Sequence, residues 1–270
     1  MTCFPSAFCL LLTFMFDWSH KVVLITGASS GIGRALASEL ARRGAALGLL
    51  ARRAEALQDV AGEIEKAGGR TQAVSADVRD AEGVRVAVMR VEEGLGSIDV
   101  LIANAGIGEP TPARELNAQV VADVLSVNVN GAVNCVTAVL PKMLKRGSGH
   151  LVAISSLAAY RGLPGSGAYC ASKAALSAFF ESLRTELQSS GVNVTTIHPG
   201  FIDTPMTRGR NQRMPYLLTV ERAAQLIVRA IETRRRTYAF PWQLAALARF
   251  GTYLPAALYD RLMARSAYRQ

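Results

Sequence analysis

Tyr169 and Lys173 stand four residues apart in the run YCASK. On a helix this spacing places both side chains on one face. A neighbouring ammonium group favours the phenolate form and lowers the pKa of a tyrosine from its ordinary value of about 10. Such a phenol can donate and accept a proton near neutral pH. Because a Tyr-x-x-x-Lys pair is common by itself, its meaning depends on the residues that surround it.

A second cluster with chemical potential is the glycine-rich run TGASSGIG, residues 26–33, which follows an apolar run and opens a helical pattern. Gly27 permits a tight turn, and Gly31 and Gly33 allow the backbone to approach a pyrophosphate closely. The helix start that follows offers unpaired N–H groups and the positive end of a dipole. The order of strand, turn and helix predicts a dinucleotide site. The expected contacts come from Thr26, Gly27, Ser29, Ser30, Gly31, Ile32 and Gly33.

The end of the second predicted strand bears on the choice of dinucleotide. An acidic residue there accepts the ribose 2′-hydroxyl of NAD, whereas this chain has Arg52 and Arg53 after Ala51. Guanidinium groups bind a 2′-phosphate well, so the sequence favours NADP(H) over NAD(H). Ser30 and Arg34 are expected to lie close enough to assist. The alternative is that both arginines are only surface charges.

Short apolar runs alternate with longer helical patterns between residues 20 and 240. This alternation predicts an α/β fold, a single-domain Rossmann fold with a doubly wound, mostly parallel sheet covered by helices on both faces. Residues 241–270 differ, since Pro241 and Pro255 bracket two short helical stretches at 242–250 and 256–265. A helix is also expected over 54–66. The predicted strands are Val22–Thr26, Leu47–Leu50, Thr71–Ser75, Ile98–Ile102, Leu151–Ile154 and Val192–Ile197.

Taken together, the motifs resemble those of the short-chain dehydrogenase/reductase family, in the branch of shorter subunits with TGxxxGxG and YxxxK motifs. The resemblance covers about residues 20–240 and implies a seven-stranded sheet. The motifs occur in family order, and Ser156 precedes Tyr169 by thirteen residues, the usual spacing in this family. They are the glycine turn at 26–33, Asp77-Val78, Asn104-Ala105-Gly106, Asn128, Ser156, Tyr169-x-x-x-Lys173 and Pro199-Gly200.

The resemblance implies four catalytic residues. Tyr169 exchanges a proton with the substrate oxygen, and Ser156 holds that oxygen by a hydrogen bond. Lys173 binds the nicotinamide ribose and tunes Tyr169, while Asn128 positions a water that links Lys173 to solvent. The hydride comes from the nicotinamide.

The remaining implied contacts are to the cofactor. Asp77 and Val78 frame the adenine, and Asn104, followed by Ala105 and Gly106, lies beside the cofactor. Ile202 and Thr204, after Pro199 and Gly200, meet the nicotinamide carboxamide.

Two departures from the family pattern affect these expectations. Ser30 stands where many NADPH-preferring relatives have a basic residue. The chain also lacks the short glycine-containing strand segment that ends bacterial ketoacyl reductases; residues 234–241 are expected to lead into the helical extension. That extension resembles the hydroxysteroid and retinol dehydrogenase branch, in which C-terminal helices support dimers or membrane contact. A homodimer is expected, with peripheral membrane contact through the basic C-terminal helices as a possible addition.

The charge of the chain is concentrated at its end. The formal net charge is +9, and residues 201–270 hold 12 of the 30 basic residues but only 4 of the 21 acidic ones. A solvated face is one reading and an anionic membrane surface another, while no nucleic-acid motif accompanies the charge. Four cysteines without a CxxC pair and three histidines predict neither a metal site nor disulfides, and fit a cytoplasmic protein.

An apolar run at residues 7–16 is too short to span a bilayer as a helix. Residues 1–19 therefore have three readings: an over-extended start with Met15 as the true one, a short surface anchor, or a segment packed on the fold.

The sequence predicts an NADP(H)-dependent oxidoreductase that interconverts a carbonyl and an alcohol on an apolar small molecule. Apolar residues after Gly200, among them Met206, suit such a substrate. The alternative is a peripheral membrane or NADP-binding scaffold protein without turnover.

Overall fold

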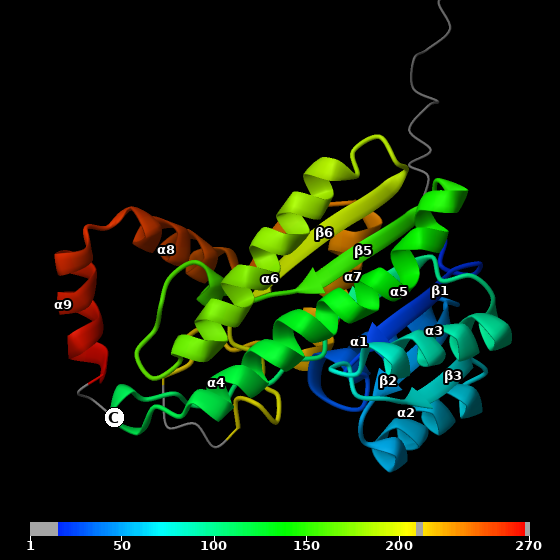
Figure 1. Ribbon diagram of the computed structural model, residues 1–270, viewed down its shortest axis with the longest axis horizontal. Coiled ribbons are helices and arrows are strands. Elements are labelled where there is room, and N and C mark those ends of the chain that lie inside the picture. Colours follow the sequence, from blue (N-terminus) through cyan, green and yellow to red (C-terminus); the bar gives the residue numbers. More distant parts are fainter. Residues whose placement is uncertain (1–15, 209–212, 268–270) are drawn as a thin grey trace, which may run out of the picture.

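The computed structural model describes residues 16–208 and 213–267 (Figure 1). Within these residues a single parallel sheet has seven strands in the order β3-β2-β1-β4-β5-β6-β7. This order confirms the predicted doubly wound α/β fold. The strands are β1 Val22–Thr26, β2 Ala46–Ala51, β3 Arg70–Ser75, β4 Val100–Ala103, β5 Gly149–Ile154, β6 Val192–Pro199 and β7 Thr237–Phe240.

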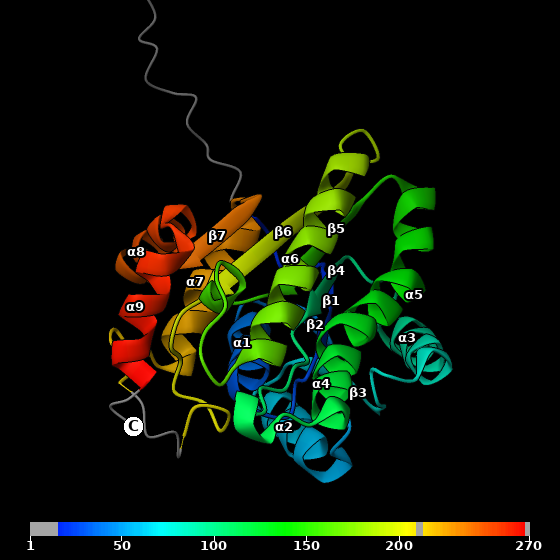
Figure 2. The ribbon, with the colours of Figure 1, turned by 60° about the vertical axis from the view of Figure 1, so that its left-hand side comes forward.

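Helices cover both faces of the sheet (Figures 1 and 2). The helices α1, α2 and α7 contribute to one buried apolar cluster and α3, α5 and α6 to the other. The helices are α1 Gly31–Arg42, α2 Ala54–Lys66, α3 Ala81–Leu95, α4 Ala118–Leu125, α5 Gly131–Arg146, α6 Gly167–Glu186, α7 Val220–Glu232, α8 Trp242–Tyr253 and α9 Ala256–Ala267.

Strand β1 lies where the winding of the sheet reverses. The chain builds β1, β2 and β3 in one direction, and then crosses to β4 on the other side of β1. Ligands of doubly wound sheets bind at such a switch point, beyond the carboxyl ends of the strands. All five residues of β1 are buried, as are all four of β4. The rigid centre of the sheet therefore ends directly beneath the expected site.

A single helical run of 29 residues, Ala118–Arg146, joins α4 to α5 through a π-helical turn at Ser126–Asn130. Its length and hydropathy suffice for a membrane span, but 44% of its most apolar window is buried inside the protein. Cys135, Val136 and Val139 of α5 belong to a core cluster beneath the sheet. This run is thus a core helix of the fold.

The seventh strand of the expected sheet, for which the sequence analysis gave no bounds, lies just before the helical extension. Residues Thr237–Phe240 form β7, which pairs in parallel with the end of β6. The amide N–H of Gly200 also donates to the Phe240 carbonyl over 2.7 Å. The strand has only four residues at the edge of the sheet, and pairing with β6 supplies order that so short a run cannot encode alone.

The N-terminal expectations lie largely outside the described residues, which include neither Met15 nor the residues before it. From Phe16 onward the chain packs on the fold. Trp18 is buried, and its Nε1 donates to Glu232 Oε1 on α7 over 2.8 Å.

Candidate active site

The glycine-rich turn between β1 and α1 forms one wall of a cleft of about 720 Å³. Gly27 and Gly31 have φ values of +67° and +55°, in the left-handed region that favours glycine. A Cβ on Gly33 would lie 2.3 Å from the Gly27 carbonyl oxygen. The turn can close only without these side chains. The resulting cradle fits a dinucleotide phosphate at the start of α1.

Two side chains beneath the cleft join the ends of β1 and β4. Thr26 Oγ1 accepts from the backbone N–H groups of Asn104 and Ala105 over 3.0 and 2.9 Å. Asn104 Nδ2 returns a hydrogen bond of 2.9 Å to the Thr26 carbonyl. Thr26 is buried, and Asn104 reaches the cleft wall. These bonds fix the glycine turn against the strand that continues into Gly106.

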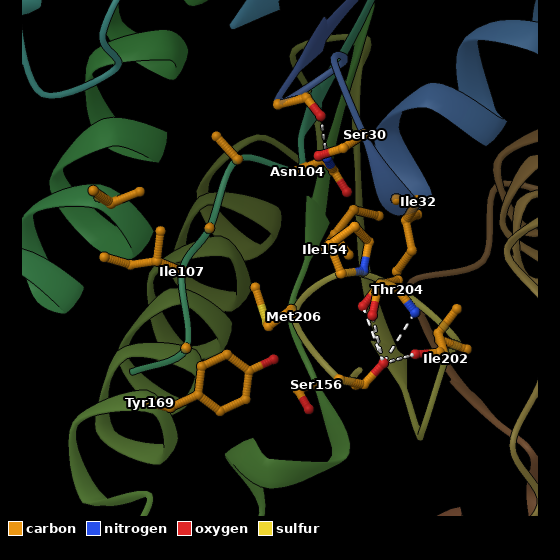
Figure 3. A pocket seen from close by; sticks show the side chains of 18 of the residues that line it. Ser30, Ile32, Asn104, Ile107, Ile154, Ser156, Tyr169, Ile202, Thr204 and Met206 are labelled. Carbon is orange, nitrogen blue, oxygen red and sulfur yellow. Dashed lines mark hydrogen bonds between the residues drawn. The ribbon is translucent and has the colours of Figure 1, made fainter. Parts of the chain in front are cut away.

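Tyr169, Lys173 and Ser156 line the same cleft, and Figure 3 shows Tyr169 and Ser156 at the opposite end from Ser30 and Asn104. Lys173 is 4% exposed, and its Nζ donates to the Ile154 carbonyl over 2.8 Å. Its ammonium lies 5.8 Å from the centre of the Tyr169 ring. Burial lowers the pKa of Lys173 to about 8. Ser156 Oγ accepts from the Ala158 N–H over 3.1 Å, so its own proton can be donated into the cleft.

Asn128 lies in the π-helical turn and is fully buried behind the cleft. Its Oδ1 accepts from the Ile107 N–H over 2.8 Å, and its Nδ2 donates to the Ile107 carbonyl and to Ser172 Oγ over 2.9 Å each. A Cβ on Gly106 would lie 3.2 Å from Asn128 Oδ1 and 3.4 Å from Lys173 Nζ. Asn128 therefore joins the loop after β4 to α6, next to the Lys173 ammonium.

The arginines after β2 lie at the end of the cleft near the glycine turn. Arg53 Nη2 donates to Ser29 Oγ over 3.2 Å, and Arg52 Nη1 lies 3.9 Å from Asp77 Oδ2. Asp77 pairs more closely with Arg79, whose hydrogen bond holds the pKa of the Asp77 carboxyl below its usual range. Arg53 thus contacts the glycine turn directly, whereas Arg52 approaches Asp77 in the lining of the same cleft.

Arg34 was expected to lie close to Arg52 and Arg53, but it pairs with an acidic residue of α2 instead. Its Nη2 donates to both carboxylate oxygens of Glu63 on α2, over 2.7 and 2.9 Å. Glu63 is 29 residues away along the chain, so local sequence offers no signal for the pairing. Ser30, the other expected helper, does line the cleft.

Most of the residues predicted for cofactor binding line the cleft, including Val78, Pro199, Gly200, Ile202 and Thr204. Thr26, Gly33 and Asn128 act from behind its wall through the contacts above. Thr207 Oγ1 donates to the Ile202 carbonyl and accepts from the Thr204 N–H, which closes this segment into a tight turn (Figure 3).

The lining residues that were not predicted lie next to predicted ones in the chain. Ile107, Gly108, Glu109 and Pro110 follow the motif at 104–106, and Pro205, Thr207 and Arg208 follow Thr204. Val127, Ile154 and Ser155 come just before Asn128 and Ser156, and Ala51 and Ala76 come just before Arg52 and Asp77. Met206, expected among the apolar residues after Gly200, also lines the cleft.

A family model described as short chain dehydrogenase matches residues 21–215. An uncharacterized oxidoreductase of Myxococcus xanthus is 42% identical over 246 residues, which cover 91% of this chain and 97% of that protein. One from Staphylococcus epidermidis is 33% identical over 212 residues, which cover 78% of this chain and 91% of that protein.

Solved structures show the same likeness. A short chain dehydrogenase/reductase from Burkholderia phymatum in complex with NAD superposes with a TM-score of 0.80 and 28% identity, covering 87% of this chain and 94% of that one. An alcohol dehydrogenase from Thermococcus sibiricus complexed with 5-hydroxy-NADP gives a TM-score of 0.73 and 30% identity, covering 82% and 94%.

The match spans more than half of the chain, and the cleft lies at the switch point of a seven-stranded Rossmann sheet. The chain therefore belongs to the short-chain dehydrogenase family and is an NAD(P)-dependent dehydrogenase or reductase.

Proposed function

We propose that this enzyme uses NADP(H) to interconvert a carbonyl and an alcohol on an apolar small molecule. The observation that carries the proposal is the arrangement of the cleft. Tyr169, Ser156 and the buried Lys173 ammonium meet at one end, and the glycine cradle with Arg52 and Arg53 forms the other. Residues 20–240 are proposed as the catalytic domain and 241–270 as an extension.

NADPH, when bound, supplies the hydride for carbonyl reduction. Ser156 donates its hydroxyl proton in a hydrogen bond to the substrate oxygen, where negative charge develops. Tyr169 transfers its phenolic proton to that oxygen. Lys173 lies in a low-dielectric setting, so its positive charge stabilises the tyrosinate strongly. Asn128 holds the loop at Ile107 beside Lys173, and its proposed part in a water relay rests on this position.

The preference for NADP(H) rests on the charges beside the glycine turn. The Arg53 guanidinium contacts Ser29, and Arg52 lines the same end of the cleft. Both groups can bind a 2′-phosphate, which NAD lacks. The solved relatives are bound to NAD in one case and to an NADP derivative in the other.

The apolar character of the substrate is inferred from the reacting end of the cleft. Ile107, Pro110, Ile154 and Met206 line this end. Burial of apolar substrate surface against such side chains favours binding.

The test is oxidation of NADPH, with NADH in parallel, against ketones and aldehydes graded from small and polar to long-chain and steroidal. We expect rates to rise with apolarity. Tyr169→Phe should bind NADPH normally and lose about three orders of magnitude in kcat, because only the proton-transfer group is removed. Binding of NADPH without turnover of any compound would support the scaffold alternative.

The cofactor preference has its own test. Replacing Arg52 and Arg53 together by glutamine should raise the Kd for NADPH about tenfold or more and leave the Kd for NADH nearly unchanged. An equal change for both cofactors would contradict a 2′-phosphate site at these arginines.

The C-terminal helices suggest a contact with an anionic membrane surface. Trp242, Leu247, Phe250 and Tyr253 of α8 are 74%, 65%, 61% and 84% exposed, and α8 holds no acidic residue. Exposed aromatic and basic side chains of this kind favour the lipid interface. Flotation with phosphatidylserine vesicles at low salt should show binding, which Trp242→Ser with Phe250→Ser should abolish. Absence of binding by the parent would remove this contact.

Enzymes of this family act on small molecules and are commonly oligomeric. We propose a homodimer located in the cytoplasm, with the membrane contact as a reversible addition. Sedimentation velocity at several concentrations distinguishes the dimer from a monomer or a tetramer.

A further inference from the structure

The segment Tyr160–Gly162 follows Ser156 after one short 3₁₀ turn, Leu157–Ala159. Beyond it the loop to Tyr169 is largely exposed, and Gly162 and Gly165 have open space where a Cβ would lie. A loop that buries so little of its own surface depends on contacts at its ends for its position. Each residue of Tyr160–Gly162 contacts at least one of the C-terminal helices α8 and α9.

Arg161 makes the largest number of these contacts. Its Nη1 donates to the carbonyl oxygens of Gly251, Leu254 and Thr252 over 2.9, 3.2 and 3.3 Å. The last carbonyls of a helix have no partner within the helix, and a cation is favourable at its negative end. Arg161 therefore caps α8 from a distance of about ninety residues along the chain.

Tyr259 of α9 contacts the same segment. The Arg161 guanidinium carbon lies 4.2 Å from the centre of its ring, within the range of a cation–π contact. Its hydroxyl donates to the Gly162 carbonyl over 2.6 Å. The adjacent loop residues Arg161 and Gly162 are thus held by two successive helices, α8 and α9.

Tyr160 links α8 to the end of β6, next to residues that line the cleft. Its hydroxyl accepts from Arg249 Nε of α8 over 3.4 Å, and its ring lies 5.1 Å from that of His198. His198 directly precedes Pro199 and Gly200, which line the cleft. The loop that begins at Ser156 and the end of β6 are therefore positioned together against α8.

Figures 1 and 2 show α8 and α9 beside the carboxyl ends of β5 and β6, away from α2 and α3. None of the residues described above for α8 or α9 lines the cleft. These helices therefore reach the cleft only through residues that they contact, which are the loop after Ser156 and Gly200, beside which Leu244 of α8 lies.

From these contacts we infer that Arg161 is a positioning residue, which fixes the Ser156 hydroxyl by anchoring the following segment to α8 and Tyr259. This inference rests on the proposed function, because it assigns Ser156 the hydrogen bond to the substrate oxygen. Ser156 Oγ is itself held by the Ala158 N–H, so displacement of Tyr160–Gly162 acts on it through only two residues.

The test is a double-mutant cycle between Arg161→Gln and Ser156→Ala in the full chain. Arg161→Gln should lower kcat about tenfold and leave the Kd for NADPH within a factor of two. In the Ser156→Ala background, followed by product accumulation over hours, the same change should have less than a twofold effect. Arg161→Lys, which keeps the charge but not the planar fork, should fall between them.

Tyr259→Phe is the second variant, and it serves where Arg161→Gln does not fold. It removes only the hydrogen bond to Gly162 and keeps the ring beneath Arg161, so we expect a loss in kcat of about threefold that also disappears with Ser156→Ala.

Equal losses with and without Ser156 would overturn the inference, since Arg161 would then act through stability alone. An unchanged kcat in Arg161→Gln would overturn it as well. If the parent chain binds NADPH but turns over no carbonyl compound, the proposed function fails and this inference fails with it. If the parent chain is active but Arg161→Gln gives either of the two results above, this inference alone fails.

Discussion

The nucleotide side of the sheet is tightly packed, whereas the α8–α9 pair is largely exposed. Around β1 and β4 every strand residue is buried, and the glycine turn leaves no room for a Cβ at Gly33. In α8 only Ala245 is buried, while four large apolar side chains lie more than half exposed. The first region is shaped by excluded volume, whereas the second is held by a few directional contacts from Arg161 and Tyr259. Substitutions should therefore act on stability in the first region and on local position in the second.

Gly33→Ala should have the largest effect on stability. The added Cβ meets the Gly27 carbonyl and Asn104 Nδ2, neither of which is a flexible side-chain end in open space. We expect a loss of about 3 kcal/mol in the free energy of unfolding, together with a large loss of NADPH binding. Gly62→Ala in α2 is the matched control, because a Cβ added there would have no atom within 4 Å. It should gain about 0.5–1 kcal/mol by the better helix propensity of alanine. Urea denaturation measures both, and similar losses in the two variants would refute the excluded-volume account.

Thr26→Val should come next. The substitution keeps the shape of the side chain but removes the oxygen that accepts from Asn104 and Ala105. Two partly buried N–H groups then lack this partner, which costs about 1–2 kcal/mol. Thr26→Ser retains the oxygen and should lose less than half of that. Chemical denaturation distinguishes them, and equal losses would assign the effect to packing.

We expect the stability of the fold to depend on pH because His198 and His150 are buried. Burial lowers the pKa of each imidazole to about 4, from an ordinary value of 6.5. Between pH 6.5 and 4 the unfolded chain therefore binds protons that the native chain does not, so stability falls as the pH falls. Each histidine contributes a slope of about 1.4 kcal/mol per pH unit in this window. His198→Gln and His150→Gln should each remove the contribution of one titrating group, about 1.4 kcal/mol per pH unit, from the slope of the free energy of unfolding against pH. An unchanged slope in either variant would show that its imidazole titrates normally.

Trp242→Ala and Tyr253→Ala should have the smallest effects. Their side chains are 74% and 84% exposed, so truncation should change the free energy of unfolding by less than about 0.5 kcal/mol. The measurement is thermal and urea unfolding at low and high protein concentration. A larger loss that grows with concentration would show that these side chains are buried against a second copy of the chain.

The sequence predicts the centre of the molecule better than its periphery. Long buried runs placed β1, β5 and β6 near their observed bounds, and the glycine turn and the Tyr169–Lys173 pair lie in the cleft as expected. The seventh strand was expected but not located in the sequence, because the order of the short edge strand β7 comes from pairing with β6. The Arg34–Glu63 pair, the Arg161 contacts and the lining at Ile107 join residues distant in sequence. A single sequence carries no periodic signal for contacts of that kind.

The π-helical turn at Ser126–Asn130 has a consequence for how this site can change over evolution. Such a turn corresponds to one residue inserted into an otherwise regular helix. Loss of a single residue there would restore the regular helix and rotate one half of the run by about 100° relative to the other. Asn128 would then face away from Ile107 and Ser172, although its codon remained intact. The number of residues in this helical run therefore matters as much as the identity of Asn128. A relative that keeps the asparagine but lacks one residue of the turn would not place it in the site.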